Sequence, residues 1–159
     1  MHKNKLYCII TLYVVSLKDY NILVHFTLRK KAELKLGTAI TVGELAESIG
    51  GKIINHPEKS GELVENYMLG AMVVDSGLDY FNRKKNKAVI IRQERLDMQL
   101  AALETPTTCL VLSGGDKAPA YRVRQKADSR GIPIITTSAT VNDIVARIDK
   151  VLGKTISSK

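Results

Sequence analysis

The sequence KAVIIRQERLDMQLAALETPTTCLVLSGGDKA, residues 87–118, decides the fold of this chain. Its two short apolar runs, AVII and CLVL, are rich in β-branched residues and have the length of buried strands. Between them, Leu96, Leu100 and Leu103 recur at a spacing that places all three on one helical face. A strand, a helix and a second strand predict a βαβ unit, in which the strands are parallel and the crossover is right-handed.

The segments on both sides of this unit continue the alternation of helices and strands. Upstream, Thr41 and Glu44 have the spacing of a capping box, and the helix that they begin is expected to end at Gly50. Downstream, Thr140 and Asp143 are expected to cap the last helix. The pattern predicts an α/β fold with a layered, mostly parallel sheet flanked by helices. The remaining elements are expected as strands at residues 52–55, 63–69 and 132–135 and as helices at residues 74–83 and 119–130.

Composition divides the chain into three parts. Residues 1–36 hold seven Lys or Arg against two Asp or Glu, whereas the remaining residues hold 17 against 14. We therefore expect an N-terminal extension at residues 1–37, either a hairpin or a loosely ordered segment, then one α/β domain at residues 38–153 and a tail at residues 154–159. Because most of the net charge of +8 lies in the extension, the α/β domain lacks the basic stripe typical of nucleic-acid binding.

No segment of the sequence predicts a membrane span or an export signal. The twelve-residue apolar run after the first lysines is shorter than the roughly 20 residues that a span requires, and it lacks a small-residue cleavage site. Cys8 and Cys109 stand in apolar runs and are expected to be buried thiols, while the three histidines share no metal-ligand spacing. We expect a cytoplasmic protein that uses no membrane, no metal and no cofactor.

Polar loops follow the carboxyl ends of the expected parallel strands, where open α/β sheets hold their ligands. Glycine lets the backbone approach a ligand closely, and arginine adds charge-assisted hydrogen bonds. These loops therefore predict a ligand-binding site that contains no catalytic group. The candidate ligand-binding residues are Arg92, Glu94, Arg95, Ser113, Gly114, Gly115, Asp116 and Thr137.

A purely structural role is the alternative for each of these candidates. Gly114 can form the turn that passes a strand to the next helix, Arg95 can pair with Glu94 or Asp97, and the Thr137 hydroxyl can satisfy a strand or helix end. A helix terminus contributes about 0.3–1 kcal/mol to anion binding, whereas micromolar affinity needs about 8 kcal/mol. A binding site at these loops therefore needs the arginines and an apolar wall as well.

The motifs that mark common enzyme active sites are missing from the sequence. It contains no GxxxxGK[ST] phosphate loop, no GxGxxG dinucleotide fingerprint and no GxSxG nucleophile elbow. Carboxylates such as Asp75 and Asp97 form no paired pattern. We therefore expect a protein that is not an enzyme, and an enzyme of unrecognised type is the least favoured alternative.

From residue 38 to about residue 151, the chain resembles the DRTGG domain family. The family name describes an acidic–Arg pair after one strand and a T-G-G run after the next, and these positions read Glu94-Arg95 and Ser113-Gly114-Gly115 here. Glu in place of Asp and Ser in place of Thr are the two departures from the pattern. The order of the pieces LAESIGG, GAM, LAAL and GIPI along the chain carries the rest of the resemblance.

The resemblance implies a fold similar to the N-terminal domain of HPr kinase/phosphorylase. Members of the family stand between CBS domains in regulated pyrophosphatases, or beside a P-loop domain similar to dethiobiotin synthetase in phosphotransacetylases. The resemblance implies that the domain acts in those proteins as a regulatory or dimer-forming module that catalyses no reaction itself. This chain shows neither companion, so we expect a stand-alone DRTGG module.

Two functions follow as hypotheses. The first is a non-catalytic regulatory or ligand-binding domain that self-associates as a homodimer, with a regulated enzyme or a CBS-domain protein as its partner in trans. The second is a sensor of a small anion or nucleotide, bound by Arg92, Arg95 and the loop from Ser113 to Asp116.

Overall fold

The computed structural model describes residues 39–70 and 77–157, with the backbone alone for residues 154–157. All of these residues belong to one compact unit, Leu34–Lys159. The expected extension at residues 1–37 lies outside the described residues, as do the first three residues of the helix expected at 74–83. The boundary between extension and domain therefore stays a prediction.

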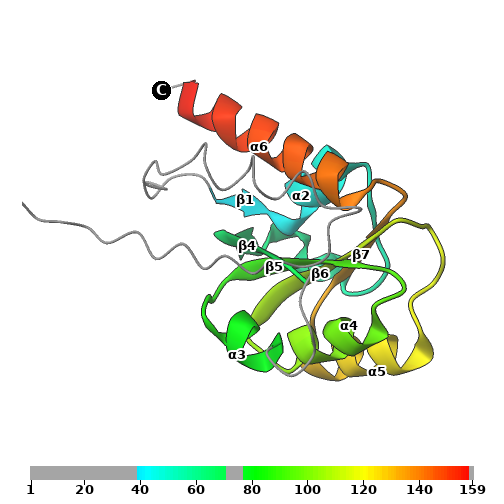
Figure 1. Ribbon diagram of the computed structural model, residues 1–159. Helices are drawn as coiled ribbons and strands as arrows, with labels where there is room; N and C mark the ends of the chain where they lie inside the picture. Colours follow the sequence, from blue (N-terminus) through cyan, green and yellow to red (C-terminus); the bar gives the residue numbers. More distant parts are fainter. Residues whose placement is uncertain (1–38, 71–76, 158–159) are drawn as a thin grey trace, which may run out of the picture. The chain divides into compact units, whose positions relative to one another are not determined.

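A five-stranded sheet forms the centre of the domain, in the order β2-β7-β6-β5-β4 (Figure 1). The β4–β5, β5–β6 and β6–β7 pairs are parallel, and the β2–β7 pair at one edge is antiparallel. The predicted α/β fold with a mostly parallel sheet is thus confirmed. The strands are β2 (Lys52–Ile53), β4 (Asn66–Leu69), β5 (Lys87–Arg92), β6 (Thr107–Ser113) and β7 (Ile134–Thr137).

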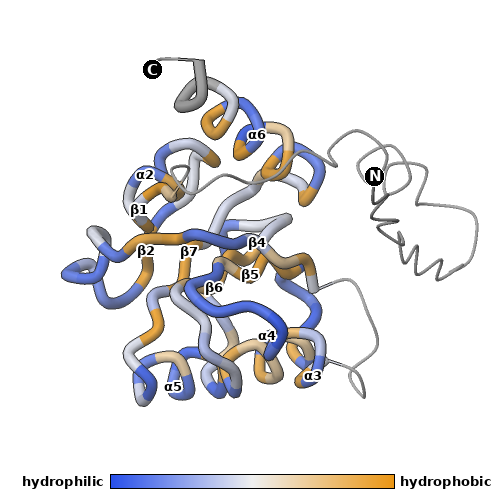
Figure 2. Tube along the Cα trace, turned by 90° about the vertical axis from the view of Figure 1, so that its left-hand side faces the viewer, coloured by the Kyte–Doolittle hydropathy of each residue, from blue (hydrophilic) through white to orange (hydrophobic). Residues whose placement is uncertain are grey.

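Helices cover both faces of this sheet, as the two perpendicular views show (Figures 1 and 2). One face packs against α2 and α6, and the other packs against α3, α4 and α5. A two-stranded antiparallel sheet of β1 and β3 lies beside α2. These elements are β1 (Ile40–Thr41), α2 (Val42–Ile49), the 3-10 helix η1 (Pro57–Gly61), β3 (Leu63–Val64), α3 (Gly77–Asn82), α4 (Leu96–Leu103), α5 (Tyr121–Arg130) and α6 (Val141–Ser157).

The β5-α4-β6 unit matches the predicted βαβ unit. Its strands pair in parallel from Ala88 opposite Cys109 to Arg92 opposite Ser113. Successive strand side chains point to opposite faces, so Ile90 joins the core under α2 and α6 while Val89 and Ile91 join the core under α3, α4 and α5. Burial of each large apolar side chain contributes about 1.5–3 kcal/mol, which is why continuous apolar runs form the central strands.

The predicted apolar stripe of α4 is only partly correct. Leu103 is fully buried, but Leu96 is 37% exposed. Leu96 is the first residue of α4, which begins just after β5 leaves the sheet. Because α4 packs against the sheet and against both α3 and α5, it buries a wider face that is lined by smaller residues. The buried residues of α4 are Met98, Gln99, Ala101, Ala102 and Leu103.

Other expected elements also have different bounds: β7 begins at Ile134 and not at residue 132, α5 begins at Tyr121 and not at residue 119, and β2 ends at Ile53 and not at residue 55. The strand expected at residues 63–69 is divided at Glu65, whose amide donates to the Asn86 carbonyl, so that β3 pairs with β1 and β4 pairs with β5. The tail expected after Gly153 does not begin there, because α6 continues to Ser157. A glycine costs about 1 kcal/mol inside a helix, which the buried face of Ile144, Ile148 and Leu152 offsets.

The capping predictions for the first and last helices are confirmed. Thr41 and Glu44 form a reciprocal capping box, and Gly50 ends α2 in the left-handed conformation. At the start of α6, the Thr140 hydroxyl accepts a hydrogen bond from the Asp143 amide, and the Asp143 carboxylate accepts one from the Thr140 amide. These caps hold the pKa of each carboxyl, Glu44 and Asp143, below its ordinary value.

Candidate functional site

The loops that follow β5 and β6 lie side by side at one edge of the sheet. Arg92 is in register with Ser113, and the Gln93 amide donates to the Ser113 carbonyl at 3.0 Å. Ser113 is in turn in register with Thr137 at the end of β7. We call this region the carboxyl edge and define it as residues 92–95, 113–116 and 136–137. The tertiary structure thus brings together all eight residues predicted for a ligand site.

The Gly114-Gly115 loop uses its amides within the fold. Gly114 has a φ of 88°, and its amide donates to the Ala139 carbonyl at 3.1 Å. The Gly115 amide donates to the Thr137 carbonyl at 3.2 Å. The two amides are therefore engaged in fixing the loop against the end of β7, which is the structural role that the sequence left open for this motif.

The hydroxyls of Ser113 and Thr137 are buried and paired in the same way. The Ser113 hydroxyl donates to the Ile91 carbonyl at 3.4 Å, and the Thr137 hydroxyl donates to the Ile49 carbonyl at 3.1 Å. Thr137 also accepts from the Ala139 amide at 3.2 Å. Each side chain is 1% exposed. These contacts tie β7 to the end of α2 and to the loop before α6.

Arg92 and Arg95 differ in how firmly they are held. Arg95 donates to Asp97 through Nε at 3.1 Å and through Nη2 at 3.0 Å, which lowers the pKa of Asp97. The expected alternative, a pair between Arg95 and Asp97, is confirmed. Arg92 lies 3.8 Å from Glu94, and both side chains are more than half exposed. Exposed pairs of this kind contribute at most about 1 kcal/mol, so Arg92 can exchange Glu94 for a ligand at low cost.

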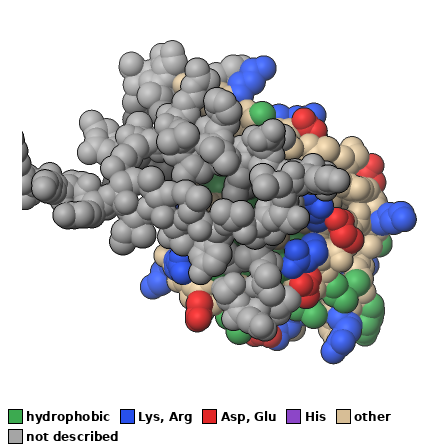
Figure 3. Space-filling view, in the orientation of Figure 1, with side chains coloured by type: hydrophobic (Ala, Val, Ile, Leu, Met, Phe, Trp, Pro, Cys, Tyr) green, Lys and Arg blue, Asp and Glu red, His purple; other side chains and the backbone are tan. Residues whose placement is uncertain are grey.

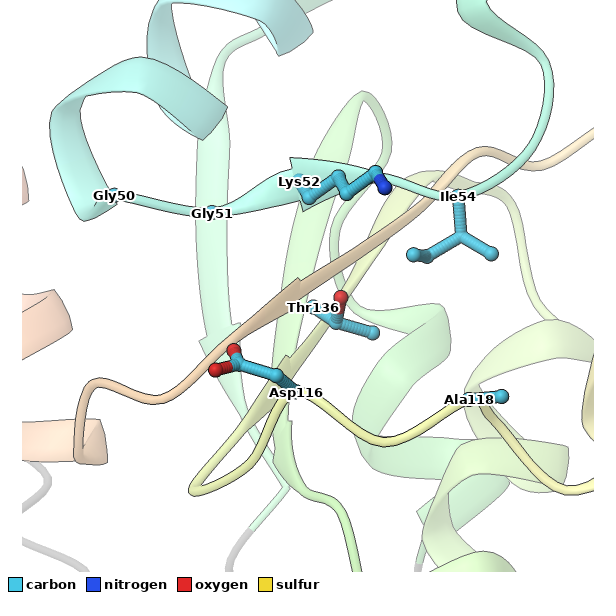
Figure 4. A pocket seen from close by; sticks show the side chains of 7 residues that line it. All are labelled: Gly50, Gly51, Lys52, Ile54, Asp116, Ala118 and Thr136. Atoms are coloured by element: carbon cyan, nitrogen blue, oxygen red, sulfur yellow. The ribbon is translucent and has the colours of Figure 1, made fainter.

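A pocket of about 330 Å³ opens beside the carboxyl edge, between β2 and the loop that follows β6 (Figure 4). Asp116 belongs to its lining and is the one predicted ligand residue that does. Thr136 forms part of its floor, on the same sheet face as Ile134, the face that α5 covers. The lining residues are Gly50, Gly51, Lys52, Ile54, Asp116, Ala118 and Thr136.

Three polar side chains of this pocket have no partner among the residues that the structure describes. Thr136 is 3% exposed, and its hydroxyl forms no hydrogen bond within the described residues. The Lys52 ammonium and the Asp116 carboxylate are exposed and form no ion pair with the part of the chain that the structure describes. Figure 4 shows the Thr136 hydroxyl pointing toward the side of the pocket on which Lys52 lies.

The sequence indicated Asp116 but missed Lys52, Ile54 and Thr136. Thr136 could have been found from the sequence, because it stands next to Thr137 in the polar run that follows the expected strand. Lys52 and Ile54 carried no signal, because β2 joins the sheet by antiparallel pairing with β7 across more than 80 residues. In the sequence, Gly51 indicated only the end of a helix. The structure shows that Gly51 also packs against β7 with no room for a side chain, because a Cβ there would lie 2.6 Å from Ile135 Cγ2.

Other kinds of site were sought in the described residues. No three His, Cys, Asp or Glu side chains among them lie together as a metal site would require. Cys109 is fully buried, and burial raises the pKa of its thiol to about 12. No helix in the described part of the chain has the length and apolarity needed to cross a membrane. Basic and acidic side chains are interspersed on the face shown in Figure 3.

These features define an open α/β domain with its loops and a pocket at the carboxyl ends of the parallel strands. The family model of the DRTGG domain matches residues 44–151. The chain therefore belongs to the DRTGG domain family, and the predicted resemblance is confirmed. Its family-name residues, Glu94-Arg95 and Ser113-Gly114-Gly115, all lie at the carboxyl edge.

The fold is shared with a solved structure of a regulatory region. It is the crystal structure of the CBS and DRTGG domains of the regulatory region of Clostridium perfringens pyrophosphatase, complexed with the activator diadenosine tetraphosphate. The TM-score is 0.63 at 18% sequence identity, over 81% of this chain and 55% of that chain. The present chain thus spans about half the length of that regulatory region, and the likeness establishes the fold.

Proposed function

We propose that this protein is a non-catalytic regulatory module that binds a small ligand at the carboxyl edge and its adjoining pocket. The observation that carries the proposal is the pocket itself, which is lined by three polar side chains that have no partner among the described residues. Membership of the DRTGG family supports it, because DRTGG domains are regulatory modules. The structural neighbour supports it further, since that regulatory region is complexed with an activator.

The module is further proposed to act as a cytoplasmic homodimer. Three large apolar side chains are exposed in the first turns of three neighbouring helices: Leu78 in α3, Leu96 in α4 and Tyr121 in α5. Their exposed fractions are 47%, 37% and 75%, and an exposed apolar surface is stabilised when a second copy covers it. A regulated enzyme or a CBS-domain protein is the proposed partner in trans.

Light scattering coupled to size-exclusion chromatography tests the dimer on the full chain. We expect twice the monomer mass at tens of micromolar, and a shift to the monomer in Tyr121→Lys. Ser129→Lys, on the same helix but away from these three residues, is the matched control and keeps the dimer. A monomer throughout this concentration range contradicts the proposed self-association.

A sensor of a small anion or nucleotide is the second candidate, and Arg92 favours it. Its guanidinium is exposed, and the ion pair that it forms within the described residues is the 3.8 Å pair with Glu94. A thermal-shift screen of nucleotides and phosphorylated metabolites tests this candidate. We expect a stabilising ligand whose effect is lost in Arg92→Gln and kept in Arg122→Gln, an exposed arginine outside the carboxyl edge. If no compound shifts the melting temperature, the sensor is excluded for these ligand classes.

A further inference from the structure

The charges of the pocket are balanced. It holds one cation, Lys52, and one carboxylate, Asp116, and neither is neutralised by another described side chain. Its apolar wall consists of the Ile54 side chain and the Ala118 methyl group. A ligand that complements this surface carries one positive group, one negative group and a small apolar part.

The Thr136 hydroxyl opens on the pocket as a polar group that a ligand can reach. It forms no hydrogen bond within the described residues, and it is not among their polar atoms that are both unpaired and buried from solvent. A ligand group can therefore take the place of solvent at this hydroxyl. Valine would fill the same space on β7 without a polar atom, and the neighbouring hydroxyl of Thr137 does find protein partners. A ligand group at this point would give the Thr136 hydroxyl the partner that the described protein does not supply.

We propose that this pocket binds a zwitterionic metabolite of the amino-acid class. Asp116 accepts hydrogen bonds from the ligand ammonium, Lys52 pairs with its carboxylate, and the Thr136 hydroxyl donates to that carboxylate. The ligand side chain packs on Ile54 and Ala118. This inference rests on the proposed function and names the class of ligand that the regulatory module responds to.

Size and charge both favour this class over a polyphosphate. A volume of about 330 Å³ lies at the lower end of the range for small-molecule sites, which is about 300–1,000 Å³. A nucleoside triphosphate brings several negative charges against one lysine, and the Asp116 carboxylate then repels it. Rejection by an unmatched charge is a common source of specificity.

The glycines at the end of α2 bring the chain close to β7 beside the pocket. Gly50 is in the left-handed conformation, and Gly51 has no room for a Cβ because Ile135 and the Thr136 backbone lie against it. The chain therefore passes from α2 into β2 without a side chain at these two positions. Lys52 is the first residue after them whose side chain can reach a ligand.

Isothermal titration of the full chain with each of the twenty standard amino acids tests the inference. At least one is expected to bind, and Asp116→Asn, Lys52→Gln and Thr136→Val are each expected to weaken it about tenfold. The matched controls are Asp79→Asn and Lys117→Gln, exposed residues outside the pocket lining, and they are expected to bind as the wild type does. Circular dichroism checks that every variant is folded.

Derivatives of the binding amino acid assign the two charged contacts. The N-acetyl form lacks the ammonium and the amide lacks the carboxylate, so each is expected to bind about tenfold more weakly to the wild type. Asp116→Asn is expected to abolish the penalty for N-acetylation, and Lys52→Gln the penalty for amidation. Penalties that persist unchanged in these variants overturn the assignment.

The outcomes separate this inference from the proposed function. If no amino acid binds at ligand concentrations of about 10 millimolar, the proposal that the ligand is an amino acid is overturned. If AMP or another nucleotide binds instead and Lys52→Gln weakens it, the regulatory pocket stands and the ligand class is wrong. If neither class binds, both the inference and the proposed ligand-binding function fail.

Discussion

The two halves of the carboxyl edge use their polar groups in opposite ways. On the β5–β6 side, the Gly114 and Gly115 amides and the Ser113 and Thr137 hydroxyls all bond within the domain. On the β2 side, the Thr136 hydroxyl has no partner among the described residues. The family-name motif therefore fixes the shape of the edge, and the groups left for a ligand stand beside the motif.

Two glycines near this edge are needed for different reasons. Gly114 needs its glycine for a φ of 88°, and a Cβ there would meet no atom within 4 Å. Gly51 needs its glycine for space, because β7 packs directly against it. Gly114 thus shapes a loop, whereas Gly51 allows a helix end to close against the sheet.

The largest expected effect breaks the contact at Gly51. Gly51→Ala places a Cβ 2.6 Å from Ile135 Cγ2 and 3.1 Å from the Thr136 carbonyl oxygen, so we expect a loss of about 3 kcal/mol in the free energy of unfolding. Gly114→Ala has room and carries only the backbone penalty of about 1–2 kcal/mol. Urea denaturation measures both, and an equal loss in the two variants contradicts the distinction between Gly51 and Gly114.

The next effect compares adjacent threonines of β7. Thr137→Val leaves the partly buried Ala139 amide without its acceptor and removes the hydroxyl that donates to the Ile49 carbonyl, and we expect a loss of about 2 kcal/mol in the free energy of unfolding. Thr136→Val removes a hydroxyl with no partner in the described structure, so its stability is expected to stay within about 0.5 kcal/mol of the wild type. A large loss in Thr136→Val, measured by urea denaturation, means that its hydroxyl serves the fold.

Lys87 extends the comparison to the opposite end of β5. Its side chain is fully buried and donates to the Pro106 carbonyl, and burial lowers the pKa of the ammonium to about 8. The unfolded chain, with the ordinary value of 10.5, binds more protons between these two values. Folding stability therefore rises with pH in this window, by up to about 1.4 kcal/mol for each pH unit.

Lys87→Met tests this linkage. We expect the variant to gain about 1–2 kcal/mol at pH 7, because it buries no charge, and the gain to shrink as the pH rises from 8 toward 10. Denaturation of both proteins at matched pH values gives the difference, in which other titrating groups cancel. A difference that is constant over this pH range contradicts the lowered pKa of Lys87.

The smallest expected effect is the difference in folding stability between variants of the two arginines in the β5–α4 turn. Arg95→Gln removes the pair with Asp97, and we expect a loss of a few tenths of a kcal/mol at pH 7. Since Arg95 lowers the pKa of Asp97, this contribution is present above pH 4 and is lost as the pH falls through the folded value. Arg92→Gln is expected to change stability still less, and thermal denaturation at pH 7 and pH 3 checks both variants.

Much of the fold was predictable because it depends on local patterns. Apolar runs of strand length, the capping pair Thr41 and Glu44, and the helix end at Gly50 each follow from neighbouring residues. The exposed position of Leu96 was not predictable, because it depends on where α4 begins relative to the sheet. The division at Glu65 depended likewise on two partners, β1 and β5, that lie far away in the chain.

For the site, the sequence by itself determined which loops meet: parallel strands that follow one another through a helix place their carboxyl ends together, and the eight candidate residues do lie at one edge. Only the tertiary structure decided which of their polar groups are already bonded, as in Gly114, Gly115 and Thr137, and which open on the pocket, as in Asp116. It also brought Lys52 beside Thr136. The physical reason is that hydrogen-bond satisfaction and long-range antiparallel pairing depend on neighbours in space, whereas periodicity and capping depend on neighbours along the chain.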